Sequence, residues 1–113
     1  MNEGSIWESL LLASHHHLCE LTLLVDFNHS TNRALSLGDL ESKMKAFGFE
    51  TISIDGHDHD QILIALRLRN DKPTAILAHT IKGFGVDMMV NNPAWHHLSP
   101  SHQELIEMIR VLK

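Results

Sequence analysis

The stretch Asn2-Glu3-Gly4-Ser5-Ile6-Trp7-Glu8, followed by Leu23-Leu24-Val25-Asp26-Phe27-Asn28, decides the fold of this chain. A helix is predicted from Ser5 to about His17. It leads through a short link into Leu21–Phe27, a nearly continuous apolar run that is typical of a central strand covered on both faces. The strand stops at Asn28 in a polar loop. A helix followed at once by a buried strand indicates an α/β domain.

Two local signals support the first helix. Ser5 and Glu8 have the spacing of a capping box, in which each side chain satisfies a free backbone N–H of the other residue. The predicted buried stripe consists of Ile6, Leu10, Ala13, Ser14 and His17.

The rest of the chain continues the alternation of helices and strands. Helical periodicity and capping residues predict further helices over Leu37–Phe47 (ended by Gly48), from Asp58 (with Gln61 at capping-box spacing) and from Ser101 (with Glu104 at the same spacing). Strands are predicted over Glu50–Asp55 and Thr74–His79. The predicted fold class is therefore α/β, with a parallel sheet, flanking helices and right-handed crossovers.

Composition limits the possible functions. The chain has 113 residues, 43 % hydrophobic and 20 % charged, which indicates one small globular domain. A net charge of -5 without a Lys/Arg cluster argues against nucleic-acid binding. Its apolar runs are too short to span a membrane, and its acidic start does not resemble a signal peptide. With Cys19 as the single cysteine, a reducing, cytoplasmic location is expected.

Asn28 is the first candidate site residue. Ligands in open parallel sheets bind outside the carboxyl ends of the strands, which is where Asn28 lies. The alternative is that Asn28 only turns the chain, because asparagine tolerates turn geometry.

Six motifs in order resemble the thiamine-diphosphate-binding region of transketolases, above all the N-terminal subunit of two-subunit transketolases. They are Asn2–Glu8, Val25–Asn28, Asp55–Asp58, Asp71–Thr74, His79–Gly85 and Asn91–His96. The resemblance covers nearly the whole chain and implies that residues 1–113 are the C-terminal half of a thiamine-diphosphate-binding domain. In the family, Asn-Glu-Gly-Ser directly follows a Gly-Asp-Gly whose Asp binds magnesium. The chain begins just after this motif and is expected to be a fragment.

The resemblance implies thiamine diphosphate and Mg²⁺ as cofactors. Asn28 would give its amide oxygen and Ser30 its main-chain carbonyl to the metal, while the carboxylate would come from the Gly-Asp-Gly motif. These neutral oxygens suit magnesium, which prefers oxygen ligands. Asp26 could replace the carboxylate but should point to the opposite side of the strand from Phe27, so a structural role is predicted for it. The loop also departs from the family, which has an apolar residue at Ser30 and several more residues before the next helix.

Two glutamates match acids of the family's dimer interface. Glu3 corresponds to a glutamate in a proton path between the two active sites, and Glu8 to a second acid there. The alternative for both is a capping or dipole role at the helix N-terminus.

Two later residues match cofactor contacts of the family. Lys82, in Lys82–Gly85, occupies a cofactor-contacting position, although these glycines could also form only a flexible turn. His96 matches a histidine that contacts the cofactor diphosphate and the donor substrate. Imidazole suits phosphate contact and proton transfer. The family has glycine after this histidine, and this chain has His97.

The resemblance implies transfer of a two-carbon ketol unit between sugar phosphates. Activity would require a C-terminal transketolase subunit or domain in a homo- or hetero-oligomer, because the glutamate that protonates the aminopyrimidine lies in another domain of the family. One alternative is a non-catalytic remnant that pairs with another subunit through the helix Glu3–Ser14. Another is transition-metal binding by His15–His17, which adjacent histidines on a helix are poorly arranged to do.

Overall fold

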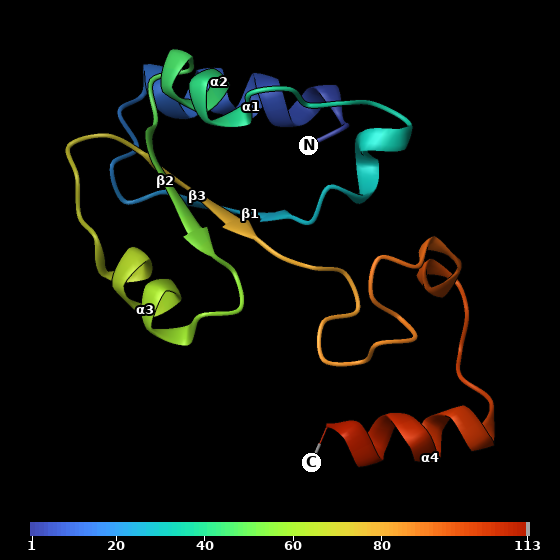
Figure 1. Ribbon diagram of the computed structural model, residues 1–113. Coiled ribbons are helices and arrows are strands. Elements are labelled where there is room, and N and C mark those ends of the chain that lie inside the picture. The colour runs from blue at the N-terminus through green and yellow to red at the C-terminus, as the bar shows by residue number, and fades with distance from the viewer. Residues whose placement is uncertain (113) are drawn as a thin grey trace. The chain divides into compact units, whose positions relative to one another are not determined.

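The computed structural model describes residues 1–112. They form two compact units: Met1–Thr80, and a second unit that begins at Ile81. The elements, labelled in Figure 1, are α1 (Gly4–His15), β1 (Thr22–Phe27), the 3-10 turn η1 (Ser30–Arg33), α2 (Leu40–Ala46), β2 (Glu50–Asp55), α3 (His59–Arg67), β3 (Thr74–His79), the 3-10 turn η2 (Pro93–His96) and α4 (His102–Val111).

The first unit is an α/β domain with a three-stranded parallel sheet, as the sequence predicts. The strand order is β1-β3-β2, and both neighbours of β3 run parallel to it. In register, Phe27 pairs with His79, and His79 pairs with Asp55. The carboxyl ends of all three strands therefore lie at one edge of the sheet.

Two hydrophobic cores hold the helices on the sheet. Figure 1 shows α1 and α2 on one face of the sheet and α3 on the other. The first core joins α1 and α2 to β1 and β3, and includes Leu10, Ala13, Leu40, Met44, Val25, Ala75 and Leu77. The second joins α3 to β2 and β3, through Ala65, Ile54, Ile76 and Ala78. Side chains alternate along a strand, so β3 contributes to both cores.

The central strand is β3, and the prediction that Leu21–Phe27 is covered on both faces is wrong. Five consecutive residues of β3, Thr74–Ala78, are buried. Within residues 1–112, β1 pairs with β3 alone, and its Leu24 side chain is 54 % exposed. The reason is that α3 packs against β2 and leaves this face of β1 uncovered. An apolar run does not by itself reveal which neighbours a strand has.

Two helices begin at residues other than those predicted. Helix α1 starts at Gly4, with Glu3 at the N-cap, so Ser5 lies inside the helix and the Ser5–Glu8 capping box does not form. Helix α2 starts at Leu40 rather than Leu37, because the Asp39 carboxylate accepts a hydrogen bond from the Ser42 N–H at 3.0 Å.

The remaining helix ends follow the sequence more closely. Asp58 caps α3, accepting from the backbone N–H groups of Asp60 and Gln61, but the Gln61 side chain accepts from Asp55 N instead of completing a capping box. Ser101 and Glu104 form the predicted box at α4. Gly48, with φ of 90°, follows the end of α2 as predicted. None of the helices in residues 1–112 combines the length and apolar sequence needed to cross a bilayer.

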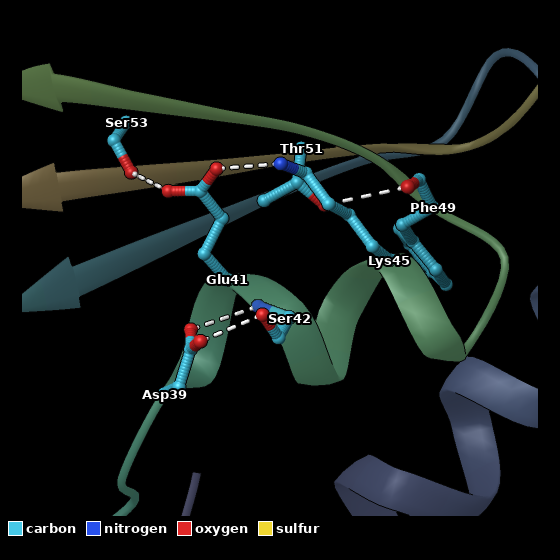
Figure 2. Close-up of polar contacts among 7 residues, drawn as sticks. All are labelled: Asp39, Glu41, Ser42, Lys45, Phe49, Thr51 and Ser53. Atoms are coloured by element: carbon cyan, nitrogen blue, oxygen red, sulfur yellow. Dashed lines mark hydrogen bonds and ion pairs between the residues drawn. The ribbon is translucent and has the colours of Figure 1, made fainter.

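A polar network attaches α2 to β2. Figure 2 shows the Glu41 carboxylate between two partners: the Lys45 ammonium one helical turn away, at 2.6 Å, and the Ser53 hydroxyl on β2, at 3.0 Å. At the start of the helix, Asp39 accepts from the Ser42 hydroxyl at 2.6 Å. The ion pair is exposed and so contributes little alone, but the Ser53 contact crosses from helix to sheet.

Because of these contacts, the free energy of unfolding should depend on pH in the acidic range. The Ser42 hydroxyl, and then its backbone N–H, lower the pKa of Asp39, and the Lys45 and Ser53 side chains lower the pKa of Glu41. A carboxylate whose pKa is lowered by folding stabilises the fold fully above its unfolded pKa, about 3.9 for aspartate. This stabilisation is lost as pH falls through the lower folded pKa.

The Asp39→Asn variant tests this linkage. Asparagine also caps helices but does not titrate, so wild type should have the higher Tm at pH 7. The Tm difference should shrink as pH falls from about 5 to about 2, since Asp39 is protonated over this range whereas asparagine does not titrate. Circular dichroism melts of both proteins across this range measure it. A Tm difference independent of pH would contradict the assignment.

Candidate functional site at the carboxyl edge of the sheet

The carboxyl edge of the sheet brings together residues from three distant segments. Asn28 follows β1, Gly56 follows β2 and Thr80 follows β3. The in-register strand ends place these three residues at neighbouring positions. Asn28 therefore lies at the carboxyl edge, where the sequence predicts it.

Asn28 turns the chain and is also held in a fixed orientation. Its side-chain Oδ1 accepts a hydrogen bond from Ser30 N at 2.9 Å, which closes a turn through His29 in a left-handed conformation, φ 58°. Its Nδ2 donates to Asp26 Oδ2 at 2.8 Å. The turn-forming role is thus observed, and the amide oxygen and the Ser30 main chain lie next to each other.

Asp26 is engaged by two partners. Besides Asn28, the Thr80 hydroxyl donates to the other carboxylate oxygen, Asp26 Oδ1. Phe27 packs against the core beneath α1 and α2, while Asp26 makes its contacts beyond the ends of β1 and β3. These bonds agree with the structural role predicted for Asp26.

Two histidines join this edge that the sequence patterns did not single out. His29 and His79 both lie against the Phe27 ring, with centroid distances of 4.3 and 5.2 Å. The signal that could have found them is their position, since each is at or just after the end of a strand. Next to Phe27 is a cavity of about 120 Å³, lined by Met1, Asn2, Val25, Asp26, Phe27, Asn28, His29, Ser30, Thr31 and Leu37.

The donor atoms at this edge fit part of a magnesium site. Asn28 Oδ1 has one lone pair beyond the bond from Ser30 N, and a main-chain carbonyl such as that of Ser30 is a suitable neutral ligand. Both are oxygens, as magnesium requires, but neither carries charge. Among residues 1–112, no group of three or more His, Cys, Asp and Glu side chains is placed to hold a metal ion.

Glu3 and Glu8 belong to α1. Glu3 is its N-cap residue, but its side chain makes no capping hydrogen bond, and its backbone carbonyl accepts from Ile6 N at 3.2 Å. Both side chains are exposed. The capping alternative is therefore not realised for the Glu3 side chain, and its role at an interface stays a prediction.

Lys82 and His96 belong to the second unit. The Lys82 carbonyl accepts from Asn91 N at 3.0 Å, which closes the loop between them. His96 is the last residue of η2; it is exposed, and its ring lies 4.6 Å from that of His97. The structure thus brings Asn28 and Ser30 together in the first unit, and it places Lys82 and His96 in the other.

The structure of this loop requires glycine at position 83. Its φ is 79°, and a Cβ atom there would lie 2.5 Å from both the carbonyl carbon and oxygen of Met89. The glycine therefore permits close approach of the chain to its own backbone. The loop carrying Lys82 thus contains a closely packed turn at Gly83.

Comparison with known proteins relates the whole described chain to one family. The model of the transketolase, thiamine diphosphate binding domain family matches residues 1–112. Transketolase-like protein 1 of Bos taurus is 36 % identical over 102 residues, which cover 83 % of this chain and 17 % of that protein. One of the subunits of the apulose-4-phosphate transketolase of Actinobacillus succinogenes is 32 % identical over 120 residues, covering 100 % of this chain and 44 % of that protein.

A solved structure agrees with these relatives. The transketolase of Campylobacter jejuni superposes with a TM-score of 0.71 at 27 % identity, over 81 % of this chain and 16 % of that chain. The chain spans less than half the length of each of these three proteins.

Substitution of Gly83 by alanine tests whether the Lys82 loop depends on the packed turn. Left-handed strain alone costs about 1–2 kcal/mol, and the overlap with Met89 adds to it. Gly83→Ala should therefore lower the free energy of unfolding, as measured by urea denaturation, or unfold the second unit locally, as measured by limited proteolysis. Gly4→Ala is the matched control, since a Cβ at Gly4 meets nothing within 4 Å. Equal stability of the two variants would contradict the packed turn.

Proposed function

Because this chain belongs to the transketolase thiamine-diphosphate-binding domain family, we propose that it forms the diphosphate-and-magnesium side of a transketolase active site. In this role it takes part in transferring a two-carbon ketol unit between sugar phosphates. The observation that supports the proposal most is the Asn28–Ser30 turn at the carboxyl edge of the sheet, with the Asn28 amide held by Asp26 and Ser30. Parallel sheets bind their ligands at this edge.

Each site residue has a separate task in the proposal. Asn28 Oδ1 and the Ser30 carbonyl would hold Mg²⁺. Lys82 supplies a positive charge for the cofactor, and the His96 imidazole contacts phosphate and moves protons near the donor substrate. Glu3 takes part in proton exchange at an interface between subunits. Thiamine diphosphate, when bound, supplies the reactive carbon that carries the ketol unit.

The proposed site needs groups from elsewhere. Two neutral oxygens bind magnesium weakly, and the Asp26 carboxylate is held by hydrogen bonds from the Asn28 amide and the Thr80 hydroxyl. We infer that the metal-binding carboxylate and the acid that faces the aminopyrimidine lie outside these residues. A relative that aligns with all of this chain is named as one subunit of a transketolase, which supports assembly with a second subunit. A cytoplasmic location is part of the same proposal.

The second candidate is a non-catalytic module that only pairs with another subunit. The observation that favours it is the apolar surface of α1. Leu11 and Leu12 are 58 % and 59 % exposed, and an apolar cavity of about 340 Å³ lies between α1 and the start of β1. The two candidates differ in cofactor binding, which only the first requires.

The Asn28→Ala variant distinguishes them. The chain is mixed with a complementary C-terminal transketolase subunit, and its Tm is measured with thiamine diphosphate at increasing Mg²⁺ and with a chelator. Wild type should be stabilised only when both ligands are present, because binding to the folded state raises its stability. Asn28→Ala should require at least about 10-fold more Mg²⁺ for the same shift, since a metal-binding oxygen is lost.

Asn32→Ala is the matched control in the same loop. Asn32 lies in η1, and among the described side chains it contacts only His29 Nδ1, at 3.4 Å. The Mg²⁺ requirement of Asn32→Ala should therefore equal that of wild type. If wild type shows no Mg²⁺-dependent stabilisation by thiamine diphosphate while still binding the subunit, the active-site proposal fails and the interaction module remains.

A further inference from the structure

Gly56 and Thr80 have no task in the proposed cofactor site, yet both lie at its edge. Gly56 directly follows β2 and Thr80 directly follows β3. Gly56 N donates to the His79 carbonyl at 2.8 Å, which continues the pairing of the two strands past their ends. On β1, the Thr80 hydroxyl meets the Asp26 carboxylate.

Gly56 is required for space and not for backbone freedom. It is not among the glycines with positive φ. A Cβ atom at this position would overlap the Thr80 Cγ2 methyl, and would lie 3.0 Å from the His79 carbonyl oxygen and 3.2 Å from Ala78 Cβ. The missing side chain of Gly56 therefore makes room for the methyl group of Thr80.

The methyl and hydroxyl groups of Thr80 move together. Both are attached to Cβ, and threonine occupies a few staggered χ1 rotamers. In the observed rotamer the methyl lies over Gly56 while the hydroxyl donates to Asp26 Oδ1. Any rotation that takes the methyl away from position 56 also takes the hydroxyl away from Asp26.

Asp26 and the Ser30 N–H together set the orientation of the Asn28 amide. An ionised carboxylate only accepts hydrogen bonds, so the Asn28 group that faces Asp26 must be the Nδ2 donor, at 2.8 Å. The Oδ1 acceptor then points to the other side, where it accepts from Ser30 N at 2.9 Å. With its amide reversed, Asn28 would present two N–H donors to the Ser30 N–H and would lose both bonds.

We propose that Gly56, Thr80 and Asp26 form a positioning relay that fixes the Asn28 amide with its oxygen toward the Asn28–Ser30 turn. The relay connects the ends of all three strands: Gly56 admits the Thr80 methyl, the Thr80 hydroxyl holds Asp26, and Asp26 holds Asn28. Its consequence for magnesium rests on the proposed function, but the orientation of Asn28 does not. All three are positioning residues, because each acts through Asn28.

The test is a mutant cycle between positions 56 and 80, read out on Asn28 itself. The side-chain NH₂ signals of Asn28 are recorded by ¹⁵N NMR in the 113-residue chain without any ligand. Gly56→Ala should shift these signals and remove their protection from hydrogen exchange, because the new methyl displaces that of Thr80. Thr80→Ser, which keeps the hydroxyl and lacks Cγ2, should leave the signals near their wild-type positions.

The double variant Gly56→Ala with Thr80→Ser should recover the Asn28 signals in large part. The remaining 3.0 Å contact with the His79 carbonyl keeps the recovery incomplete. Thr80→Val supplies an independent arm, because it retains the shape of threonine but loses the hydroxyl, and it should perturb Asn28. Thr80→Val therefore tests the relay even if Gly56→Ala fails to fold.

The relay is overturned if Thr80→Val leaves the Asn28 NH₂ signals unchanged, or if the double variant is no closer to wild type than a folded Gly56→Ala. A second readout is the Mg²⁺ concentration needed for thiamine diphosphate binding with the complementary subunit. It should rise about 10–100-fold in Thr80→Val and not in Thr80→Ser. If Asn28 responds as expected but no protein binds the cofactor, the relay stands and the proposed function fails.

Discussion

The structure of the first unit depends on the pairing of β3 with a parallel strand on each side. Four consecutive buried residues of β3, Ala75–Ala78, supply both hydrophobic cores, and no polar side chain could replace them without a large cost. Parallel strands in register end at the same edge. The chain therefore gathers residues from the ends of β1, β2 and β3 at one place, where Asp26 and Thr80 are hydrogen-bonded although 54 positions separate them in sequence.

This edge is held by polar contacts, while the rest of the unit is held by apolar packing. Asp26 accepts from Asn28 and from Thr80, and Thr80 packs over Gly56. Such contacts orient side chains more than they stabilise the fold, since exposed hydrogen bonds compete with water. In the relay that we propose, they fix the orientation of one amide group, which a metal site built on neutral oxygens would require. The helices α1, α2 and α3 stabilise the sheet that carries this edge.

The sequence predicted the local features of the fold well. The bounds of β2 and β3 and the Ser101–Glu104 capping box follow from short-range patterns that the structure confirms. Where two local signals competed, prediction was less accurate. Ser5 had the correct spacing for a cap, but α1 starts before it, and Gln61 bonds to Asp55 N instead of completing its box.

Contacts between distant segments could not be predicted from patterns. Nothing in the sequence around Thr80 indicates Asp26 as its partner, because the contact exists only once β1 and β3 pair. The prediction that β1 is covered on both faces was wrong for the same reason, since an apolar run does not specify which elements lie beside it. At the site, Asn28 and Ser30 were selected by resemblance and lie together at the edge. Their roles toward metal and cofactor remain predictions.

We propose above all that the carboxyl edge of this sheet is a diphosphate-and-magnesium site. The most direct measurement is ¹⁵N chemical-shift mapping of the labelled chain, mixed with its complementary subunit, before and after addition of thiamine diphosphate and Mg²⁺. We expect the cofactor-dependent changes to centre on Asn28–Ser30 and Thr80, and to disappear when Mg²⁺ is chelated. Changes confined to α1, or unaffected by the chelator, would contradict it.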